Sequence, residues 1–221
     1  MVYAHVEREG HRTMARDTSP IVKQSRREGY ALHPKAHKIM AKKTGIPGMH
    51  ANGRQGKPSL YLTQLREKQK VRRTYGLLEK QFSRLMHEAD RSSNQGSLPG
   101  EVLLQLLERR LDNAVYRAGF ATSRRAARQL VSHGHFLLNG RRVNIPSIRL
   151  KIGDEIAIRP KSAKSGYFSQ MDEIAKNTFQ DTLSWLASDQ KKLTISIIGL
   201  PKREEAETDI KEQLIVEYYS R

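Results

Sequence analysis

The sequence predicts an α+β fold, mostly helical, with a small module that combines a helix–turn–helix pair and short antiparallel strands. The helices are predicted by apolar residues that recur at helical spacing in several segments between residues 59 and 131. The strands are predicted by short apolar runs after residue 135, two of which flank an Asn-Gly turn.

Composition narrows the class of function. The chain has 221 residues with 40 Lys+Arg against 23 Asp+Glu, a formal net charge of +17, and such an excess favours a polyanionic partner. No apolar run approaches the ~20 residues of a membrane span, and the first residues lack the apolar segment of a secretory signal. Cysteine is absent, which excludes disulfides and thiolate metal sites. We therefore expect a cytoplasmic nucleic-acid-binding protein with no cofactor and no membrane contact.

The charge is unevenly distributed along the chain. Residues 1–170 hold 33 Lys+Arg and 13 Asp+Glu, whereas residues 171–221 hold 7 and 10. We expect the polyanion to lie against the first three quarters of the chain, and the last quarter to pack on protein.

The first 73 residues contain one strong helix signal. Residues 1–43 are polar and basic, and are expected to be extended or disordered until a partner orders them. Residues 44–58 hold four Gly and two Pro and predict an irregular loop. Ser59 suits the N-cap of a helix that runs to Arg73. This helix is apolar and basic on several sides, which suits contact with both a protein core and a phosphate backbone.

The next elements follow from apolar spacing and turn residues. A helix from about Leu77 to Arg91 is predicted by a regular apolar stripe, and residues 91–100 predict a linker. Residues 100–119 predict one helix that ends at Gly119, which suits a left-handed cap. Thr122 or Ser123 then caps a second helix, so the two form a short helix–turn–helix pair.

This second helix carries three arginines on one face. Arg124, Arg125 and Arg128 share an arc opposite a stripe of Ala, Leu and Val, and no acidic residue lies nearby in the sequence. Such a cluster can be a merely solvated face, but a helix N-terminus favours anions and unpaired arginines strengthen that preference. We expect this face to contact phosphate.

The strand region completes the module. Phe136-Leu137-Leu138 and Arg141-Arg142-Val143 are predicted to pair through a type I′ turn at Asn139-Gly140. Glu155-Ile156-Ala157-Ile158 predicts a further strand after the turn residues Gly153-Asp154.

The segment ERRLDNAVYRAGFATSRRAARQLVSHGHFLLNGRRVNIPS closely resembles the small RNA-binding module named after the fourth protein of the small ribosomal subunit, here called S-four. The stretches Ser59–Gly76 and Glu212–Arg221 resemble the S-four ribosomal protein family itself. The resemblance implies a primary 16S rRNA-binding protein that nucleates assembly of the subunit body, lies near the mRNA entrance channel, and contacts the ribosomal protein S-five at a surface tied to decoding accuracy.

The family pattern also implies how the chain is divided. In that family the module is inserted into a helical domain made from segments before and after it. We therefore expect a basic N-terminal segment at 14–43, the first part of the helical domain at 44–107, the RNA-binding module at 108–170, and a segment at 171–221 that packs back on the helices. Residues 1–13 have no counterpart in the pattern, and we expect translation to begin at Met14.

Residues of the helix 59–73, the loop before it, the N-terminal segment and the module are the candidate RNA contacts. They are Arg26, Arg27, His50, Arg54, Tyr61, Gln64, Lys68, Lys70, Arg72, Arg73, Arg124, Arg125, Arg128, His133, His135, Asn139, Arg141 and Arg142.

Metal binding is not expected. Many relatives carry a four-cysteine zinc knuckle near the N-terminus, but here Val22 and Ser25 stand at its first two positions. His133 and His135 lack a third ligand nearby, so RNA contact or helix capping is the better interpretation. His33, His37 and His50 match no usual metal-site spacing, and their basic neighbours oppose a cation.

Two other classes of function fit the sequence less well. Pseudouridine synthases often carry the same module and place their catalytic aspartate in a Gly-Arg-Leu-Asp context, which Arg110-Leu111-Asp112 partly matches. Asp112 is instead expected to pair with a neighbouring arginine or to cap a turn, and no length remains for a catalytic domain. A free-standing RNA chaperone is disfavoured because the segments outside the module match the ribosomal protein. We expect no enzymatic activity.

Overall fold

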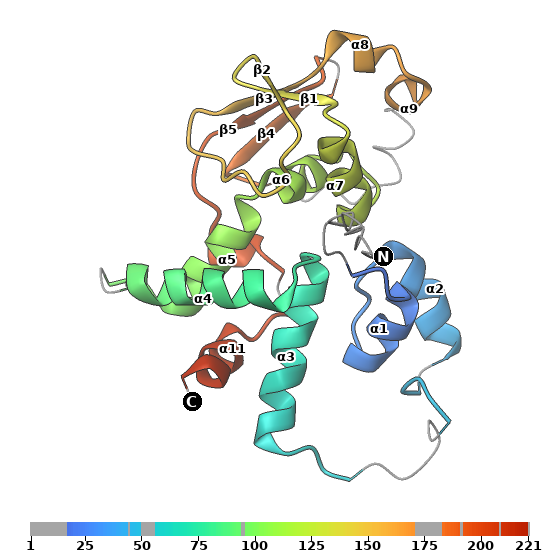
Figure 1. The fold of residues 1–221 in the computed structure, drawn as a ribbon, viewed down its shortest axis with the longest axis vertical. Helices are drawn as coiled ribbons and strands as arrows, with labels where there is room; N and C mark the ends of the chain where they lie inside the picture. Colours follow the sequence, from blue (N-terminus) through green and yellow to red (C-terminus); the bar gives the residue numbers. More distant parts are fainter. Residues whose placement is uncertain are drawn as a thin grey trace, which may run out of the picture.

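Helices and one small sheet make up the chain, which confirms the predicted α+β class (Figure 1). The computed structural model describes residues 17–43, 45–49, 56–93, 96–170, 183–190, 192–207 and 209–220. The sheet lies at one end with two helices beneath it, and the remaining larger helices form the other end (Figure 1). The expectations for residues 1–13 and for Met14 lie outside the described residues.

The N-terminal segment differs from its prediction because its described part is helical. It forms α1 (Ile21–Glu28) and α2 (Pro34–Lys42), which pack on each other. Buried Ser25 joins α1 to the loop that leads into α2: its Oγ donates to the Ile21 carbonyl at 2.8 Å and accepts from the Leu32 amide at 3.3 Å. Glu28 at the end of α1 binds Arg66 at 3.1 Å and also Arg73, so the pair of helices is held on α3.

The helical end is built on a single apolar cluster. Its helices are α3 (Leu60–Thr74), α4 (Glu79–Ser93), α5 (Pro99–Glu108) and α11 (Glu212–Tyr219). The predicted N-cap is confirmed, since Ser59 Oγ accepts from the Leu62 amide at 3.2 Å. Phe82, Leu103 and Ile215 are fully buried among these helices. The C-terminal helix α11 therefore packs on α3 and α5, far away in sequence.

The predicted continuous helix over residues 100–119 is wrong, because it is two helices. The first, α5, ends at Glu108, and α6 (Leu111–Arg117) begins after an extended Arg110 (ψ 139°). At the break the backbone bonds to a distant loop instead of to itself: Leu150 N donates to Arg109 O, and Leu111 N donates to Ile148 O, both at 2.9 Å. These bonds satisfy the groups that a continuous helix would have paired internally.

The module combines α6 and α7 (Arg124–Ser132) with a five-stranded antiparallel sheet of order β2-β1-β3-β5-β4. The three predicted strands are confirmed as β1 (Phe136–Leu138), β2 (Arg141–Val143) and β3 (Glu155–Ile158). The predicted turn is confirmed too, since Asn139 and Gly140 have φ of 49° and 79°. Phe120, Phe136 and Ile156 lie in the core between helices and sheet.

The last quarter of the chain was expected to pack back on the helices, and it also contributes strands to the sheet. Two of its segments, β4 (Leu186–Asp189) and β5 (Thr194–Ile197), extend the sheet beside β3. A 3₁₀ turn, η1 (Arg203–Glu205), then leads back to α11. Two short helices, α8 (Pro160–Ala163) and α9 (Gly166–Ser169), follow β3. The strands β4 and β5 were not predicted, because short, partly polar runs give weak sequence signals.

Candidate nucleic-acid interface

The arginine helix α7 begins as the sequence predicted. Ser123 is its N-cap and its Oγ accepts from the Ala126 amide at 3.3 Å. Ala127 and Val131 are fully buried against the sheet. The opposite face bears Arg124, Arg125 and Arg128, and the structure gives these three side chains different surroundings.

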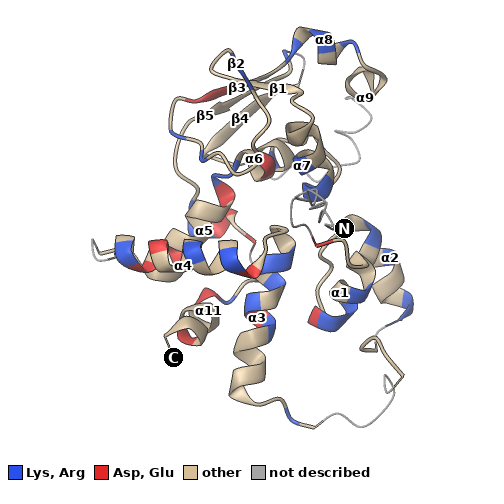
Figure 2. Ribbon diagram, in the orientation of Figure 1, with Lys and Arg blue, Asp and Glu red and all other residues tan. Residues whose placement is uncertain are grey.

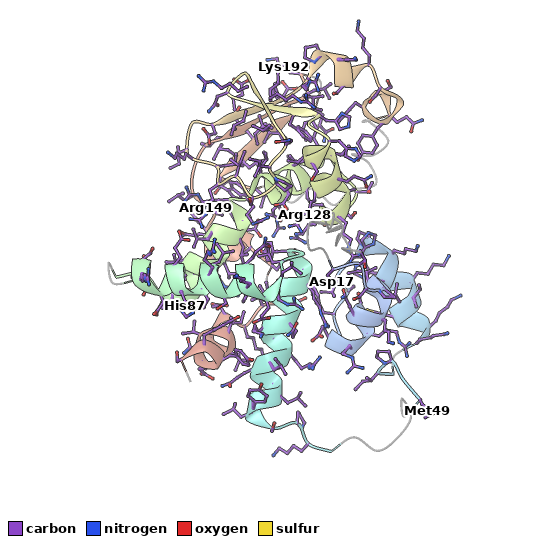
Figure 3. All side chains as sticks on the ribbon, in the orientation of Figure 1. Asp17, Met49, His87, Arg128, Arg149 and Lys192 are labelled. Carbon is purple, nitrogen blue, oxygen red and sulfur yellow. The ribbon has the colours of Figure 1, made fainter. Side chains whose placement is uncertain are left out.

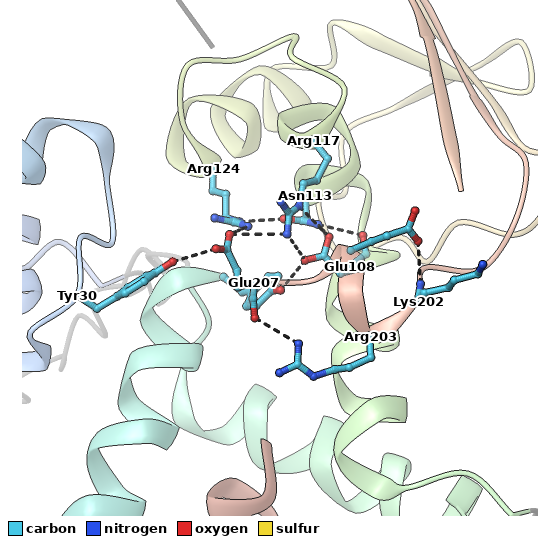
Figure 4. Close-up of polar contacts among 10 residues, drawn as sticks. Tyr30, Glu108, Asn113, Arg117, Arg124, Lys202, Arg203 and Glu207 are labelled. Atoms are coloured by element: carbon cyan, nitrogen blue, oxygen red, sulfur yellow. Dashed lines mark hydrogen bonds and ion pairs between the residues drawn. The ribbon is translucent and has the colours of Figure 1, made fainter. Parts of the chain in front are cut away.

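Arg124 is enclosed by protein (Figure 4). Its guanidinium lies between the rings of Tyr75 and Tyr116, 5.0 Å and 4.6 Å from their centroids. Its Nε donates to Asn113 Oδ1 at 2.9 Å and its Nη2 to Glu207 Oε1 at 2.6 Å. Only 15% of the side chain is exposed. A side chain used in this way has few donors left for phosphate.

Glu207 joins three parts of the chain at this point (Figure 4). Besides Arg124, its carboxylate accepts a hydrogen bond from Tyr30 Oη at 2.9 Å and lies 3.7 Å from Arg117 Nη2. Burial opposes ionisation, but Arg124 and Arg117 overcome it, so the pKa of Glu207 is lowered. Burial lowers the pKa of Arg124, but the Glu207 carboxylate overcomes this effect and raises it. Both groups are therefore held in their charged forms.

A second carboxylate, that of buried Glu108, belongs to the same network, because Arg117 contacts both Glu207 and Glu108. Glu108 accepts from Tyr75 Oη at 2.5 Å, from Asn113 Nδ2 at 2.7 Å and from Arg117 Nη2 at 2.9 Å. Burial and the neighbouring Glu108 carboxylate raise the pKa of Tyr75 well above its ordinary value, so its hydroxyl remains a donor.

Arg128 is also used within the protein. Its Nη2 lies 2.6 Å from Asp112 Oδ2, and its guanidinium donates to the carbonyls of Tyr75, at 3.0 Å, and Gly76 at the end of α3. Asp112 binds Arg110 as well, at 3.2 Å, which confirms that this aspartate pairs with neighbouring arginines. The expectation that the arginine face lacks acidic partners is wrong for Arg124, whose partner Glu207 is 83 positions away, and for Arg128.

Arg125 is the arginine of α7 that remains exposed, and no ion pair joins it to any residue that the structure describes. It lines a cleft between α7, α1–α2 and the end of α3, together with His33, Arg73 and Gly76. Burial, and then the charges of Arg125 and Lys35, lower the pKa of His33, which indicates a positive potential there. The N-terminus of α7 adds its partial positive charge to this cleft.

Among the other candidates, some are exposed and some are bound within the protein. Arg27, His133, Asn139, Arg141, Arg142 and Tyr61 are exposed. Arg142 lies close to Gly134 just beyond α7, since a Cβ built on that glycine would come within 2.8 Å of Arg142 Nε. His50 and Arg54 lie outside the described residues.

The candidates on α3 mostly have protein partners. Buried Lys68 binds Glu79 at 2.7 Å and lies over the Tyr218 ring at 4.4 Å, and Gln64 donates to Glu217 at 2.8 Å. The contacts with Tyr218 and Glu217 attach α11 to α3, and the contact with Glu79 attaches α4 to it. The other candidates so engaged are Lys70 with Asp209 O, Arg72 with Gln69, Arg73 with Glu28, Arg26 with Gly45 O, and His135 with Ser162.

Charged residues are unevenly distributed over the helices (Figure 2). Lys and Arg predominate on α1, α2, α3 and α7, α4 carries both signs, and the charged residues of α5 and α11 are all Glu. No group of three or more potential metal ligands occurs among the described residues. Over the same residues, no helix is long and apolar enough to cross a membrane.

Comparison with known proteins shows to which family this sequence belongs. Residues 16–108 match the family described as "Ribosomal protein S4/S9 N-terminal domain" and residues 109–156 match the "S4 domain". The small ribosomal subunit protein uS4 of Syntrophomonas wolfei is 48% identical over 214 residues, covering 94% of this chain and 100% of the relative. The chain belongs to the uS4 family. The uS4 proteins of Chloroflexus aurantiacus and Roseiflexus sp. are 47% and 46% identical over 209 residues, again with 94% of this chain and 100% of each relative covered.

The S-four resemblance of the sequence motifs is thereby confirmed, for a member of the uS4 family without cysteine. The matched relatives are named as ribosomal proteins, which supports the expectation of a structural role. Sequence reasoning missed the residues that surround Arg124, chiefly Glu207, Glu108 and Asn113. Nothing local marks them, because a carboxylate 83 positions away becomes a partner only through the fold.

Proposed function

We propose that this uS4-family chain is a cytoplasmic structural component of the small ribosomal subunit that binds 16S rRNA directly and is not an enzyme. The observation that carries the proposal is the exposed Arg125 beside the N-terminus of α7, in a basic cleft, within a chain of this family. Arginine suits such a site because its planar group bonds phosphate bidentately and stacks on bases. Folded RNA is recognised mostly through its backbone and shape.

The RNA surface that we propose consists of the exposed part of the predicted set. Arg125 stands at the start of α7, Arg142 lies near its end, and Arg141 directly precedes Arg142 on the same hairpin. Arg27 extends the surface onto α1. His50, Arg54 and Tyr61 remain proposed contacts. The buried or paired members of the predicted set are proposed to shape the surface and not to be main contacts with the RNA.

The family also supports finer proposals. We propose that the protein nucleates assembly of the subunit body, lies near the mRNA entrance channel, and contacts S-five in a way that affects decoding accuracy. We further propose that the module is an insertion into the helical domain, because α11 packs on α3 and α5 after the chain has completed the sheet.

Binding of purified protein to a 16S rRNA fragment, with nucleotide footprinting, tests the proposal. Arg125→Ala with Arg142→Ala should weaken binding and lower the salt slope of log K by about 0.7–0.9 for each phosphate that the variant no longer neutralises. Arg84→Ala removes an exposed cation on α4, which does not line the cleft; it is the matched control and should bind as wild type. If the double variant kept wild-type affinity and salt slope, this surface would not be the RNA-binding face.

A further inference from the structure

The module and the helical end do not share an apolar core. Their buried apolar residues form two separate clusters, one around Phe120, Phe136 and Trp185 and the other around Phe82 and Leu107. Parts joined without a large apolar interface are expected to move relative to each other unless other contacts hold them. The relative orientation of the two parts must therefore depend on polar contacts at their boundary.

The polar contacts across this boundary include three groups of charged side chains. Arg149 forms a bidentate ion pair with Glu88 of α4. These side chains are 40% and 39% exposed, and exposed ion pairs contribute little to stability. In the second group, Arg128 donates to the carbonyls of the residues that end α3. Arg128 and Arg149 both belong to the module and lie apart along the boundary (Figure 3). The third group is the enclosed network at Glu207.

Glu207 differs from the other boundary contacts in what it connects. Its carboxylate binds the module through Arg124 at 2.6 Å and the N-terminal helices through Tyr30 at 2.9 Å, while its own backbone leads into α11 (Figure 4). Arg124 is in turn fixed between Tyr75 of the α3 end and Tyr116 of the module. One charged group therefore restrains three segments that are distant in sequence.

We propose that Glu207 is a positioning residue for RNA binding. It fixes the module against the N-terminal helices so that Arg125 of α7 and the cations of α1 and α2 face the same RNA. Rigid alignment of two binding surfaces raises the overall affinity for RNA, because once one surface is bound the second meets the RNA at a high effective concentration. This inference rests on the proposed function, since it concerns how the parts of the proposed RNA surface are aligned.

The test uses Glu207→Gln, which keeps the shape of the side chain and removes its charge. The chain has no cysteine, so Lys38→Cys on α2 and Lys151→Cys in the module, both exposed, give unique sites for a pair of spin labels. We expect one narrow distance distribution in the wild-type background and a broader one with Glu207→Gln. The unlabelled Gln variant should bind the 16S fragment about tenfold more weakly, at a temperature where both proteins are folded by circular dichroism.

Two further variants keep the test decisive. Glu204→Gln removes the charge of an exposed carboxylate in η1, three residues before Glu207. It should alter neither the distances nor the affinity. Tyr30→Phe removes only the hydroxyl that binds Glu207. It should broaden the distance distribution and weaken RNA binding to a smaller extent, and it replaces Glu207→Gln in the test if that variant does not fold.

An unchanged distance distribution in both Glu207→Gln and Tyr30→Phe would overturn the inference, whatever the affinity. A broader distribution with wild-type affinity would also overturn it, because alignment would then not matter for binding. If wild-type protein failed to bind the RNA, the proposed function would fall, and with it the RNA-binding role of Glu207. The distances would still report whether Glu207 holds the two parts together.

Discussion

Arg124 and Arg125 are adjacent on one helix, yet we predict that their replacement by alanine has opposite consequences. Arg124→Ala should destabilise the fold, because it leaves Glu207 with its charge enclosed and only Arg117, 3.7 Å away, as a cationic partner. Arg125→Ala removes an exposed group and should leave the free energy of unfolding unchanged within about 0.5 kcal/mol.

The magnitude for Arg124→Ala follows from its surroundings. Breaking a buried ion pair costs about 3–5 kcal/mol, and a cation held against aromatic rings adds about 0.5–2 kcal/mol. The two side chains retain 15% and 21% exposure, which weakens both contributions, so we expect a cost slightly below the lowest sum of these ranges, about 3 kcal/mol. At about 2–4 °C per kcal/mol for a chain of this size, the melting temperature should fall by roughly 6–12 °C.

Thermal unfolding followed by circular dichroism measures this difference directly, with Arg125→Ala as the matched control. The RNA assay should show the reverse order at a temperature where all the proteins are folded: Arg125→Ala should reduce affinity, and Arg124→Ala should reduce it only through alignment of the module. A melting temperature for Arg124→Ala within about 1 °C of wild type would refute the structural role of this residue.

Three other predictions concern stability. Gly100→Ala should cost about 1–3 kcal/mol in chemical denaturation, because its Cβ would lie 2.7 Å from Glu212 Cγ and force α5 from α11; a wild-type midpoint would contradict this. Leu130→Ala should cost about 1–2 kcal/mol, since Leu130 is only partly buried; a cost as large as that of a fully buried leucine would show tighter packing. Because the pKa of Glu207 is lowered on folding, its stabilisation is complete above its ordinary value of 4.5 and is lost as the pH falls through the lower folded value. The stability difference between wild type and Glu207→Gln should therefore shrink in acid, and a constant difference would contradict the assignment.

Local sequence determined much of this protein. The cap at Ser59, the Asn139-Gly140 turn and the β1 to β3 strands depend on neighbouring residues, so their signals could be recognised without a structure. The family motifs and the basic charge were equally visible in the chain. The break after Glu108 was not, because it exists only through backbone bonds to residues 148–150.

The sequence could also place three arginines on one face of α7, but it could not say which of them would remain free. Periodicity fixes the direction in which a side chain leaves its helix, whereas its partners come from segments that the chain brings together over long distances. Glu207 reaches Arg124 across 83 positions and Asp112 reaches Arg128 across 16. Only the tertiary structure therefore decided that Arg124 and Arg128 join the two parts of the protein and that Arg125 faces outward, because burial and ion pairing depend on neighbours in space.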